Sequence, residues 1–126
     1  MGMRKALLDA NFILTCVKQK IDFFEFLEHE GIEPWISKEI LREISAISNS
    51  RDRGLVRKDA ELALNIMKNN EFRRVHTGGR TVDAGIIKFA KENPEVIVAT
   101  LDAEIKRKVK NKKLIIRSKK MLEIVD

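Results

Sequence analysis

The sequence has little of what secreted, membrane-spanning or zinc-binding proteins usually require. Its one cysteine, Cys16, excludes a disulfide within the chain. No apolar run approaches the roughly 18 residues of a transmembrane helix, and no long apolar stretch follows the N-terminal charges as in a signal peptide. The two histidines, His29 and His76, lie among polar neighbours and form no zinc-binding pattern with Cys16. We therefore expect a cytoplasmic protein without a zinc site.

Positive charge, by contrast, is in excess and unevenly distributed. The 126 residues suit one domain with one core, so we expect residues 1–126 to form a single domain. The net charge is +6, and residues 106–120 contain nine lysines and arginines and no acid. This segment can be a solvated helix face followed by a lysine-protected edge strand. It can equally bind a polyanion such as nucleic acid.

Short apolar runs alternate with helical patterns along the chain. This alternation predicts a three-layer α/β/α fold with a mostly parallel central sheet and right-handed crossovers. Ser37, Thr81 and Asp102 are suitable helix N-caps. We expect an apolar face on the helix at 55–69, formed by Leu55, Leu62, Ala63 and Ile66. Strands are expected at 5–8, 33–36, 72–76, 96–100 and 114–117, with 121–125 extending the sheet, and helices at 12–20, 22–30, 37–48, 55–69, 81–93 and 102–111.

Two aspartates follow apolar runs that read as buried strands. Asp9 follows residues 6–8, and Asp102 follows residues 96–101. Because the carboxyl ends of parallel strands share one edge of a sheet, these carboxylates converge if the two strands are neighbours. Converging carboxylates repel each other unless a proton or a cation neutralises them. The pattern therefore predicts a divalent-metal site.

Two further acids border the predicted core. Glu43 lies only about 40° from Ile47 on the helix at 37–48, and Asp83 heads the apolar stripe of the helix at 81–93. Each acid also has a structural explanation: Asp9 and Asp102 as helix caps, Glu43 as a boundary residue and Asp83 as a first-turn acid. Their conjunction at one predicted sheet edge, where open α/β sheets bind ligands, favours a shared site. Asn11 and Thr100 stand where they can orient a carboxylate or a water molecule.

Four short motifs, in this order along nearly the whole chain, resemble those of the PIN-domain family of metal-dependent ribonucleases. The motifs are Leu8-Asp9-Ala10-Asn11, residues 37–44 with Glu43, Thr81-Val82-Asp83-Ala84, and Ala99-Thr100-Leu101-Asp102. The pattern looks more like compact archaeal members related to rRNA-processing nucleases than like VapC toxins. One departure is Ala84, where many relatives have a second acid.

The resemblance implies a sheet of strand order 3-2-1-4-5 and cleavage of single-stranded RNA. It also implies Mg²⁺ or Mn²⁺ held by Asp9, Asp83 and Asp102, with Glu43 as a further ligand or water-orienting group. The all-oxygen ligand set agrees with these ions. A homodimer and an antitoxin-like or ribosome-assembly partner are further expectations. Because of Ala84, a non-catalytic RNA-binding or assembly module that retains the fold stays open as an alternative.

The positive charges offer candidate contacts to the RNA backbone. A phosphate-binding protein of the flavodoxin or receiver type also has acids at strand ends, but it does not account for Glu43. The sequence lacks the interleaved aromatics of a base-stacking platform, so we expect little base-specific recognition. The candidate RNA-binding residues are Arg51, Arg53, Arg57, Lys58, Lys106, Arg107, Lys108 and Lys110.

Self-association has one candidate surface, the short helix at 22–30. Phe23, Phe26 and Leu27 share one face of this helix, and Phe24 widens it. These side chains can contact a second copy of the chain, or they can simply cover the sheet.

Overall fold

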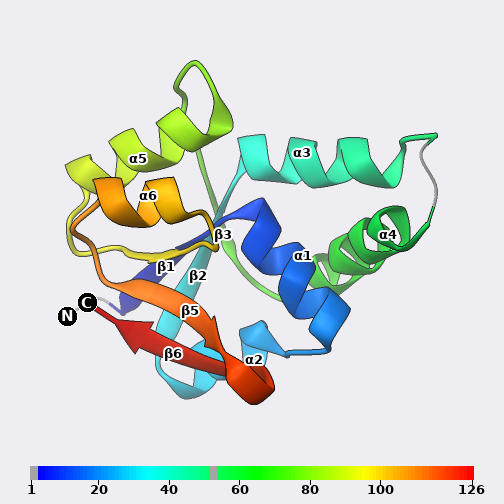
Figure 1. Ribbon diagram of the computed structural model, residues 1–126, viewed down its shortest axis with the longest axis horizontal. Coiled ribbons are helices and arrows are strands. Elements are labelled where there is room, and N and C mark those ends of the chain that lie inside the picture. The colour runs from blue at the N-terminus through cyan, green and yellow to red at the C-terminus, as the bar shows by residue number, and fades with distance from the viewer. Residues whose placement is uncertain (1–2, 52–53) are drawn as a thin grey trace.

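A mixed sheet runs through the middle of the protein, which a computed structural model describes at residues 3–51 and 54–126 (Figure 1). Within these residues the sheet has six strands in the order β3-β2-β1-β4-β5-β6. All neighbouring strands are parallel except β5 and β6, which are antiparallel. The predicted order 3-2-1-4-5 is therefore confirmed, with β6 added at one edge. The strands are β1 Arg4–Leu8, β2 Ile32–Ser37, β3 Arg73–Val75, β4 Ile97–Ala99, β5 Lys113–Arg117 and β6 Met121–Val125.

Helices cover both faces of the sheet. Figure 1 shows α5 and α6 on one side of the strands and α1, α3 and α4 packed together on the other. This arrangement follows from right-handed crossovers, which change face where the strand order reverses between β3 and β4. None of the helices in the described residues is long and apolar enough to cross a bilayer. The helices are α1 Ala10–Gln19, α2 Phe23–His29, α3 Lys38–Ser48, α4 Leu55–Lys68, α5 Val82–Glu92 and α6 Ala103–Lys108.

Side-chain caps fix where several helices begin. Ser37 Oγ accepts a hydrogen bond from the Ile40 N–H at 3.0 Å, and Thr81 Oγ1 accepts one from the Ala84 N–H at 3.1 Å. Asp102 Oδ1 accepts from two N–H groups of the first turn of α6. These three predicted caps are confirmed. Because α1, α3 and α6 each follow a parallel strand directly, their N-termini all lie at the carboxyl edge of the sheet.

The basic helix α6 is shorter than predicted and ends at Lys108 rather than near residue 111. Val109 has extended backbone angles, and Asn111 is buried. The Asn111 side-chain amide donates to the carbonyl groups of Ala90, Asn93 and Val96 at 2.8–3.1 Å. These hydrogen bonds join Asn111 to the end of α5 and to the segment that precedes β4, and the chain is extended where it reaches them.

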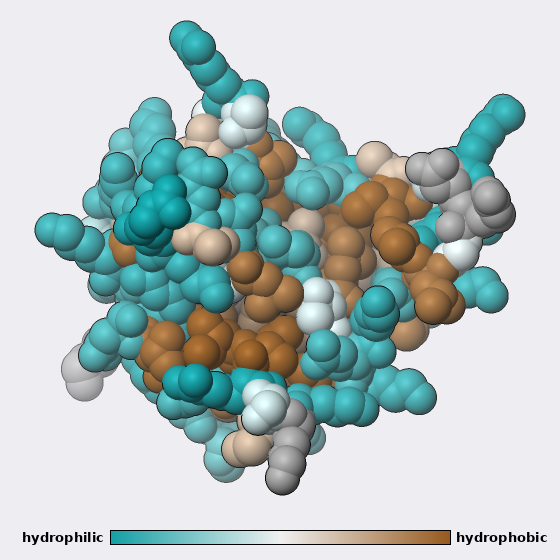
Figure 2. Space-filling model, in the orientation of Figure 1, coloured by the Kyte–Doolittle hydropathy of each residue, from teal (hydrophilic) through white to brown (hydrophobic). Residues whose placement is uncertain are grey.

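The predicted apolar face of α4 is partly wrong. The helix buries Ala60, Ala63 and Met67, whereas Leu55 is 68% exposed and Leu62 is 49% exposed. Small alanine side chains let α4 approach α1 and α3 closely, so close packing rather than hydrophobicity alone sets the buried face. Figure 2 shows exposed apolar side chains in the region where Figure 1 places α4.

The aromatic cluster of α2 belongs to the core. Phe23, Phe24 and Leu27 are buried, and Phe26 packs half-buried against the same core. The Phe23 ring lies edge-on to Phe12 with 6.2 Å between ring centroids. These residues therefore cover the protein's own sheet, and α2 offers no exposed aromatic face to a second copy.

Candidate active site

Asp9 and Thr100 lie side by side at the carboxyl ends of β1 and β4. The register that pairs Leu8 with Ala99 brings the next residues together. Thr100 Oγ1 donates a hydrogen bond to Asp9 Oδ2 at 2.7 Å, while Asp9 Oδ1 accepts one from the Ala10 N–H at 2.8 Å. Asp9 is 5% exposed and Thr100 is fully buried. Asp9 is thus at once the cap of α1 and a carboxylate with a fixed orientation.

The pKa of Asp9 reflects a competition between burial and hydrogen bonding. Burial raises this pKa above its ordinary value, and the hydrogen bonds from Thr100 and Ala10 oppose the rise. The negative charges of Asp83 and Asp102 raise it further. Asp102 therefore lies near enough to Asp9 for its charge to act on this carboxyl group.

Asp102 and Asn11 connect the loop after β4 to the starts of two helices. The Asp102 N–H donates to Thr100 Oγ1 at 3.1 Å, so Thr100 bridges Asp9 and Asp102. Asp102 uses Oδ1 for both capping hydrogen bonds to α6, at 2.8 and 3.0 Å. Asn11 is exposed, and its Oδ1 accepts from the Leu101 N–H at 3.4 Å. Asn11 therefore supports this loop from α1.

Glu43 and Asp83 complete the group of carboxylates from two further helices. Burial raises the pKa of Glu43, and the charges of Asp9 and Asp83 add to the effect. Burial likewise raises the pKa of Asp83, followed by the charges of Asp102 and Glu104. Both side chains are more exposed than Asp9, so solvent reaches this side of the group.

Glu104 is a fifth acid at this edge, and the sequence reasoning missed it. It lies in the first turn of α6, two residues after Asp102, which is the signal that would have identified it. Lys108 Nζ lies 2.8 Å from the Glu104 carboxylate, one helical turn away. The Glu104 charge contributes to the raised pKa of Asp83, while the Lys108 ammonium partly offsets that charge.

A divalent cation suits this donor set, which consists of carboxylates alone. In residues 3–51 and 54–126, however, no three Asp, Glu, His or Cys side chains are gathered into a coordination sphere. Mg²⁺ usually keeps several waters and takes only one or two carboxylates directly. A spaced set of acids fits that mode of binding, and a cation would offset the repulsion that raises the pKa values of Asp9, Glu43 and Asp83.

The predicted RNA-binding cations lie in two separate places. Lys106, Arg107 and Lys108 are on α6, which begins at the site, and Lys110 lies exposed just beyond it. Arg51 follows the end of α3, Arg57 and Lys58 lie in the first turn of α4, and all three are exposed. In Figure 1 the end of α3 and the start of α4 lie away from the starts of α1, α5 and α6. Arg57 forms a 3.6 Å salt bridge with Glu61. Arg53 lies outside the described residues.

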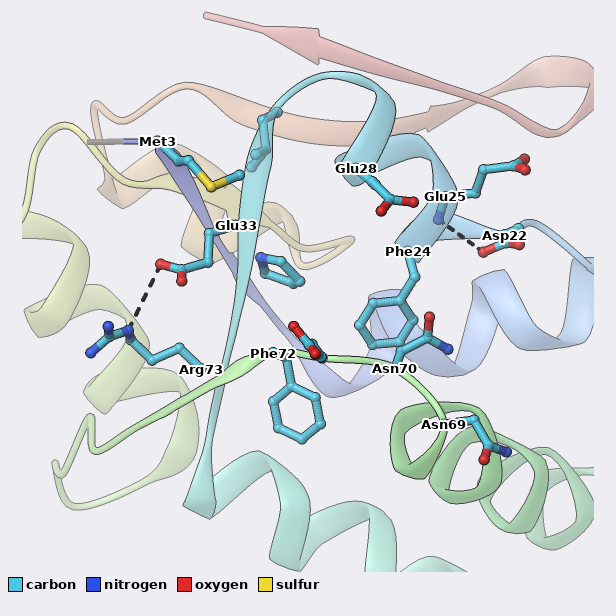
Figure 3. Close-up of a pocket in the computed structure, with 13 residues that line it drawn as sticks. Met3, Asp22, Phe24, Glu25, Glu28, Glu33, Asn69, Asn70, Phe72 and Arg73 are labelled. Carbon is cyan, nitrogen blue, oxygen red and sulfur yellow. Dashed lines mark hydrogen bonds and ion pairs between the residues drawn. The ribbon is translucent and has the colours of Figure 1, made fainter. Parts of the chain in front are cut away.

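A groove of about 900 Å³ lies at the opposite, amino edge of the sheet (Figure 3). Its one arginine, Arg73, lies 3.8 Å from the carboxylate of Glu33. The other charged residues that line the groove are acids, so this surface repels polyanions. The groove is lined by five carboxylates: Asp22, Glu25, Glu28, Glu33 and Glu71.

Comparison with known proteins identifies relatives in sequence. A family model described as a PIN like domain matches residues 6–119. Ribonuclease VapC4 of Methanocaldococcus jannaschii is 34% identical over 129 aligned positions, which cover 97% of each protein.

Two solved structures share the fold. The PIN domain endonuclease Utp24 superposes with a TM-score of 0.72 and 24% identity, covering 97% of this chain and 96% of the Utp24 chain. VapBC2 from Rickettsia felis, solved bound to a DNA fragment from its promoter, matches with a TM-score of 0.52 and 12% identity over 86% of this chain and 98% of the other. At these identities the likeness concerns the fold alone.

Repulsion among the carboxylates should be measurable as a gain in stability when one of them is neutralised. A carboxyl group whose pKa is raised by folding favours the folded protein only while it is protonated. Its contribution to stability is fully present below the ordinary pKa, which is 4.5 for Glu43, and is lost as the pH rises through the pKa of the folded protein. Glu43→Gln is thus expected to raise the melting temperature at pH 7, without divalent cations, by about 1–3 °C, a small shift because water screens this exposed side chain. Thermal melts at pH 7 and pH 3.5 should show the gain only at pH 7.

Glu61→Gln is the matched control, since Glu61 is an exposed glutamate of α4 paired with Arg57. No gain is expected for this variant at either pH. A Glu43→Gln protein that is less stable than the wild type at pH 7 would contradict the repulsion.

Proposed function

The chain belongs to the PIN-like domain family, and we propose that it is a divalent-metal-dependent endoribonuclease that hydrolyses phosphodiester bonds of single-stranded RNA. The observation that carries the proposal is the buried Asp9 carboxylate, held by Thr100 within a group of acids that raise one another's pKa values. A relative named as a ribonuclease supports RNA as the substrate. In this proposal residues 1–126 form one PIN-like domain that acts in the cytoplasm.

Each site residue has a defined task in the proposed reaction. Asp9, Asp83 and Asp102 hold Mg²⁺ or Mn²⁺, and Glu43 is a further ligand or orients the attacking water. When bound, the ion supplies Lewis-acid activation of water and offsets charge on the phosphate. Thr100 fixes the orientation of Asp9 and, by accepting a hydrogen bond from the Asp102 N–H, the course of the loop between β4 and α6. Asn11 Oδ1 accepts a hydrogen bond from the Leu101 N–H and so supports the loop between Thr100 and Asp102.

Two biological roles are consistent with this chemistry, a VapC-like toxin and an RNA-processing nuclease acting on rRNA. The name of the Methanocaldococcus jannaschii relative favours the first. A toxin needs an antitoxin-like partner, and a processing nuclease can work with a ribosome-assembly partner. The exposed Leu55, Val56 and Leu62 of α4 offer an apolar surface that a second copy of the chain can cover in a homodimer.

The alternative is a non-catalytic RNA-binding or assembly module. Ala84 favours it, because Ala84 removes an acid that many relatives have at this position. Glu104 favours the enzyme, because a carboxylate on a different helix acts on Asp83 although Lys108 partly offsets its charge. The presence or absence of metal-dependent cleavage separates the two functions.

Replacing Asp102 tests the proposed reaction. Asp102→Asn keeps a good helix cap but removes a carboxylate of the metal site. Divalent-metal-dependent cleavage of single-stranded RNA is expected to fall at least about 100-fold, while RNA affinity is retained or increases because local negative charge is lost. Cleavage assays and binding assays on the same proteins measure the two effects. A wild-type protein that binds RNA but does not cleave it with Mg²⁺ or Mn²⁺ would favour the non-catalytic module.

The cations after Asp102 are expected to bind the RNA backbone without taking part in chemistry. Neutralising Lys106, Arg107, Lys108 and Lys110 with glutamine should weaken RNA binding. It should also reduce the magnitude of the slope of log affinity against log salt by about 0.7 for each lost contact to a single strand. Cleavage at saturating RNA should change little.

Lys18→Gln and Lys68→Gln, in the last turns of α1 and α4, are the controls for general loss of charge. They should leave the slope nearly unchanged. An unaltered affinity and slope in the fourfold α6 variant would show that this segment is only a solvated helix face.

A further inference from the structure

Glu39 of α3 binds the loop that leads from β3 into α5. Its Oε1 accepts hydrogen bonds from the Thr77 N–H and Oγ1, both at 3.3 Å, and its Oε2 accepts one from the Gly78 N–H at 3.3 Å. His76 Nδ1 lies 2.5 Å from the same Oε2. One carboxylate thus gathers three consecutive residues of the loop.

This carboxylate is held in its ionised form. Its side chain is 15% exposed, and burial alone would raise its pKa. Hydrogen bonds from the backbone N–H groups of Glu39 itself, Thr77 and Gly78, together with the charge of His76, outweigh burial and lower the pKa. The loop therefore binds a charged acceptor.

The same loop is pressed directly against the backbone of α5. A Cβ atom on Gly85 would lie 2.0 Å from the Gly78 carbonyl oxygen and 3.1 Å from Thr77 Oγ1. A Cβ on Gly79 would lie 2.6 Å from the Gly85 nitrogen. Only glycine permits such a close approach of the loop to the helix. Glycine at position 85 therefore allows the contact, although glycine lowers the stability of a helix. The contact fixes the first turns of α5 relative to the loop.

These contacts connect the two helices that present Glu43 and Asp83. Glu43 follows Glu39 by about one turn of α3, and Asp83 precedes Gly85 by two residues in α5. The helices lie on opposite faces of the sheet, and the loop passes around its carboxyl edge beside the start of α3 (Figure 1). The path from one acid to the other therefore runs through the Glu39 carboxylate, the loop backbone and Gly85.

We propose that Glu39 is a positioning residue of the active site, which sets the placement of Asp83 relative to Glu43 by clamping residues 76–78 against α5. The inference rests on the proposed function, since the placement serves metal binding and cleavage. Glu39 touches neither substrate nor metal in this role. It acts on the site through the loop.

Two variants break the clamp from opposite sides. Glu39→Gln keeps the size of the side chain but replaces one accepting oxygen with an amide donor that faces other donors. Gly85→Ala removes no carboxylate from the chain, but its added Cβ pushes the loop away from α5. Glu33→Gln is the matched control. The Glu33 carboxylate is also partly buried and accepts a hydrogen bond from Trp35 Nε1 at 2.7 Å, but it lies toward the amino edge of the sheet, away from the site.

The experiment measures Mn²⁺ affinity by calorimetry in the absence of RNA, and single-turnover cleavage as a function of RNA concentration. Both clamp variants are expected to bind Mn²⁺ about tenfold more weakly. A loss of this size is at the lower end of the range seen when a residue that supports metal ligands is replaced. The cleavage rate at saturating RNA should fall by a similar factor, with the half-saturating RNA concentration unchanged. The control variant should match the wild type in both measurements.

Wild-type Mn²⁺ affinity in a folded Glu39→Gln protein would overturn the positioning role while leaving the proposed function intact. A Glu39→Gln protein that loses thermal stability but keeps wild-type Mn²⁺ affinity and cleavage rate would also overturn the positioning role. If Gly85→Ala does not fold, Glu39→Gln alone decides. A wild-type protein that neither binds Mn²⁺ nor cleaves RNA would overturn the proposed function, and the positioning role with it.

Discussion

The parallel pairing of β1 with β4 is the constraint on which the rest of the site depends. These strands are far apart in sequence, and their register places Asp9 directly beside Thr100. The hydrogen bond between the two side chains, 2.7 Å long and shielded from water, then fixes a carboxylate at the edge of the sheet. Because Asp9 also caps α1, and Asp102 caps α6, the same residues begin two helices and present acids to the site.

The acids at this edge oppose one another, and the fold tolerates their repulsion. Burial and neighbouring negative charges raise the pKa values of Asp9, Glu43 and Asp83. Fixed hydrogen bonds from Thr100 and Ala10 partly compensate at Asp9, which is the most buried of them. This repulsion lowers the stability of the folded protein, and such groups of carboxylates with raised pKa values are typical of functional sites.

The parts of the structure that were predictable from the sequence are those with local signals. Apolar runs indicated the buried strands β1 and β4, and Ser37, Thr81 and Asp102 marked helix starts that the structure confirms. The edge shared by Asp9 and Asp102 followed from the general geometry of parallel sheets. The buried face of α4 and the early end of α6 did not follow, because close packing through Ala60 and Ala63 and the three carbonyl contacts of Asn111 are tertiary features.

The Glu39 clamp was also beyond sequence reasoning. Glu39 and the loop at 76–78 are nearly 40 residues apart along the chain, and Gly85 looks like an ordinary helix glycine until its contact with Gly78 is known. Glu104 had a local signal, its position in the first turn of α6 after Asp102, but its effect on Asp83 depends on how α5 and α6 pack.

In the proposed function, acids from four separate elements of the fold form one cation site. This can be examined in a crystal structure of the protein grown with Mn²⁺, with anomalous diffraction recorded at the manganese edge. We expect an anomalous peak within direct or water-mediated reach of Asp9, Asp83 and Asp102, with Glu43 facing the same ion. Manganese bound elsewhere, with these four carboxylates making no direct or water-mediated contact to it, would show that they do not form a shared cation site.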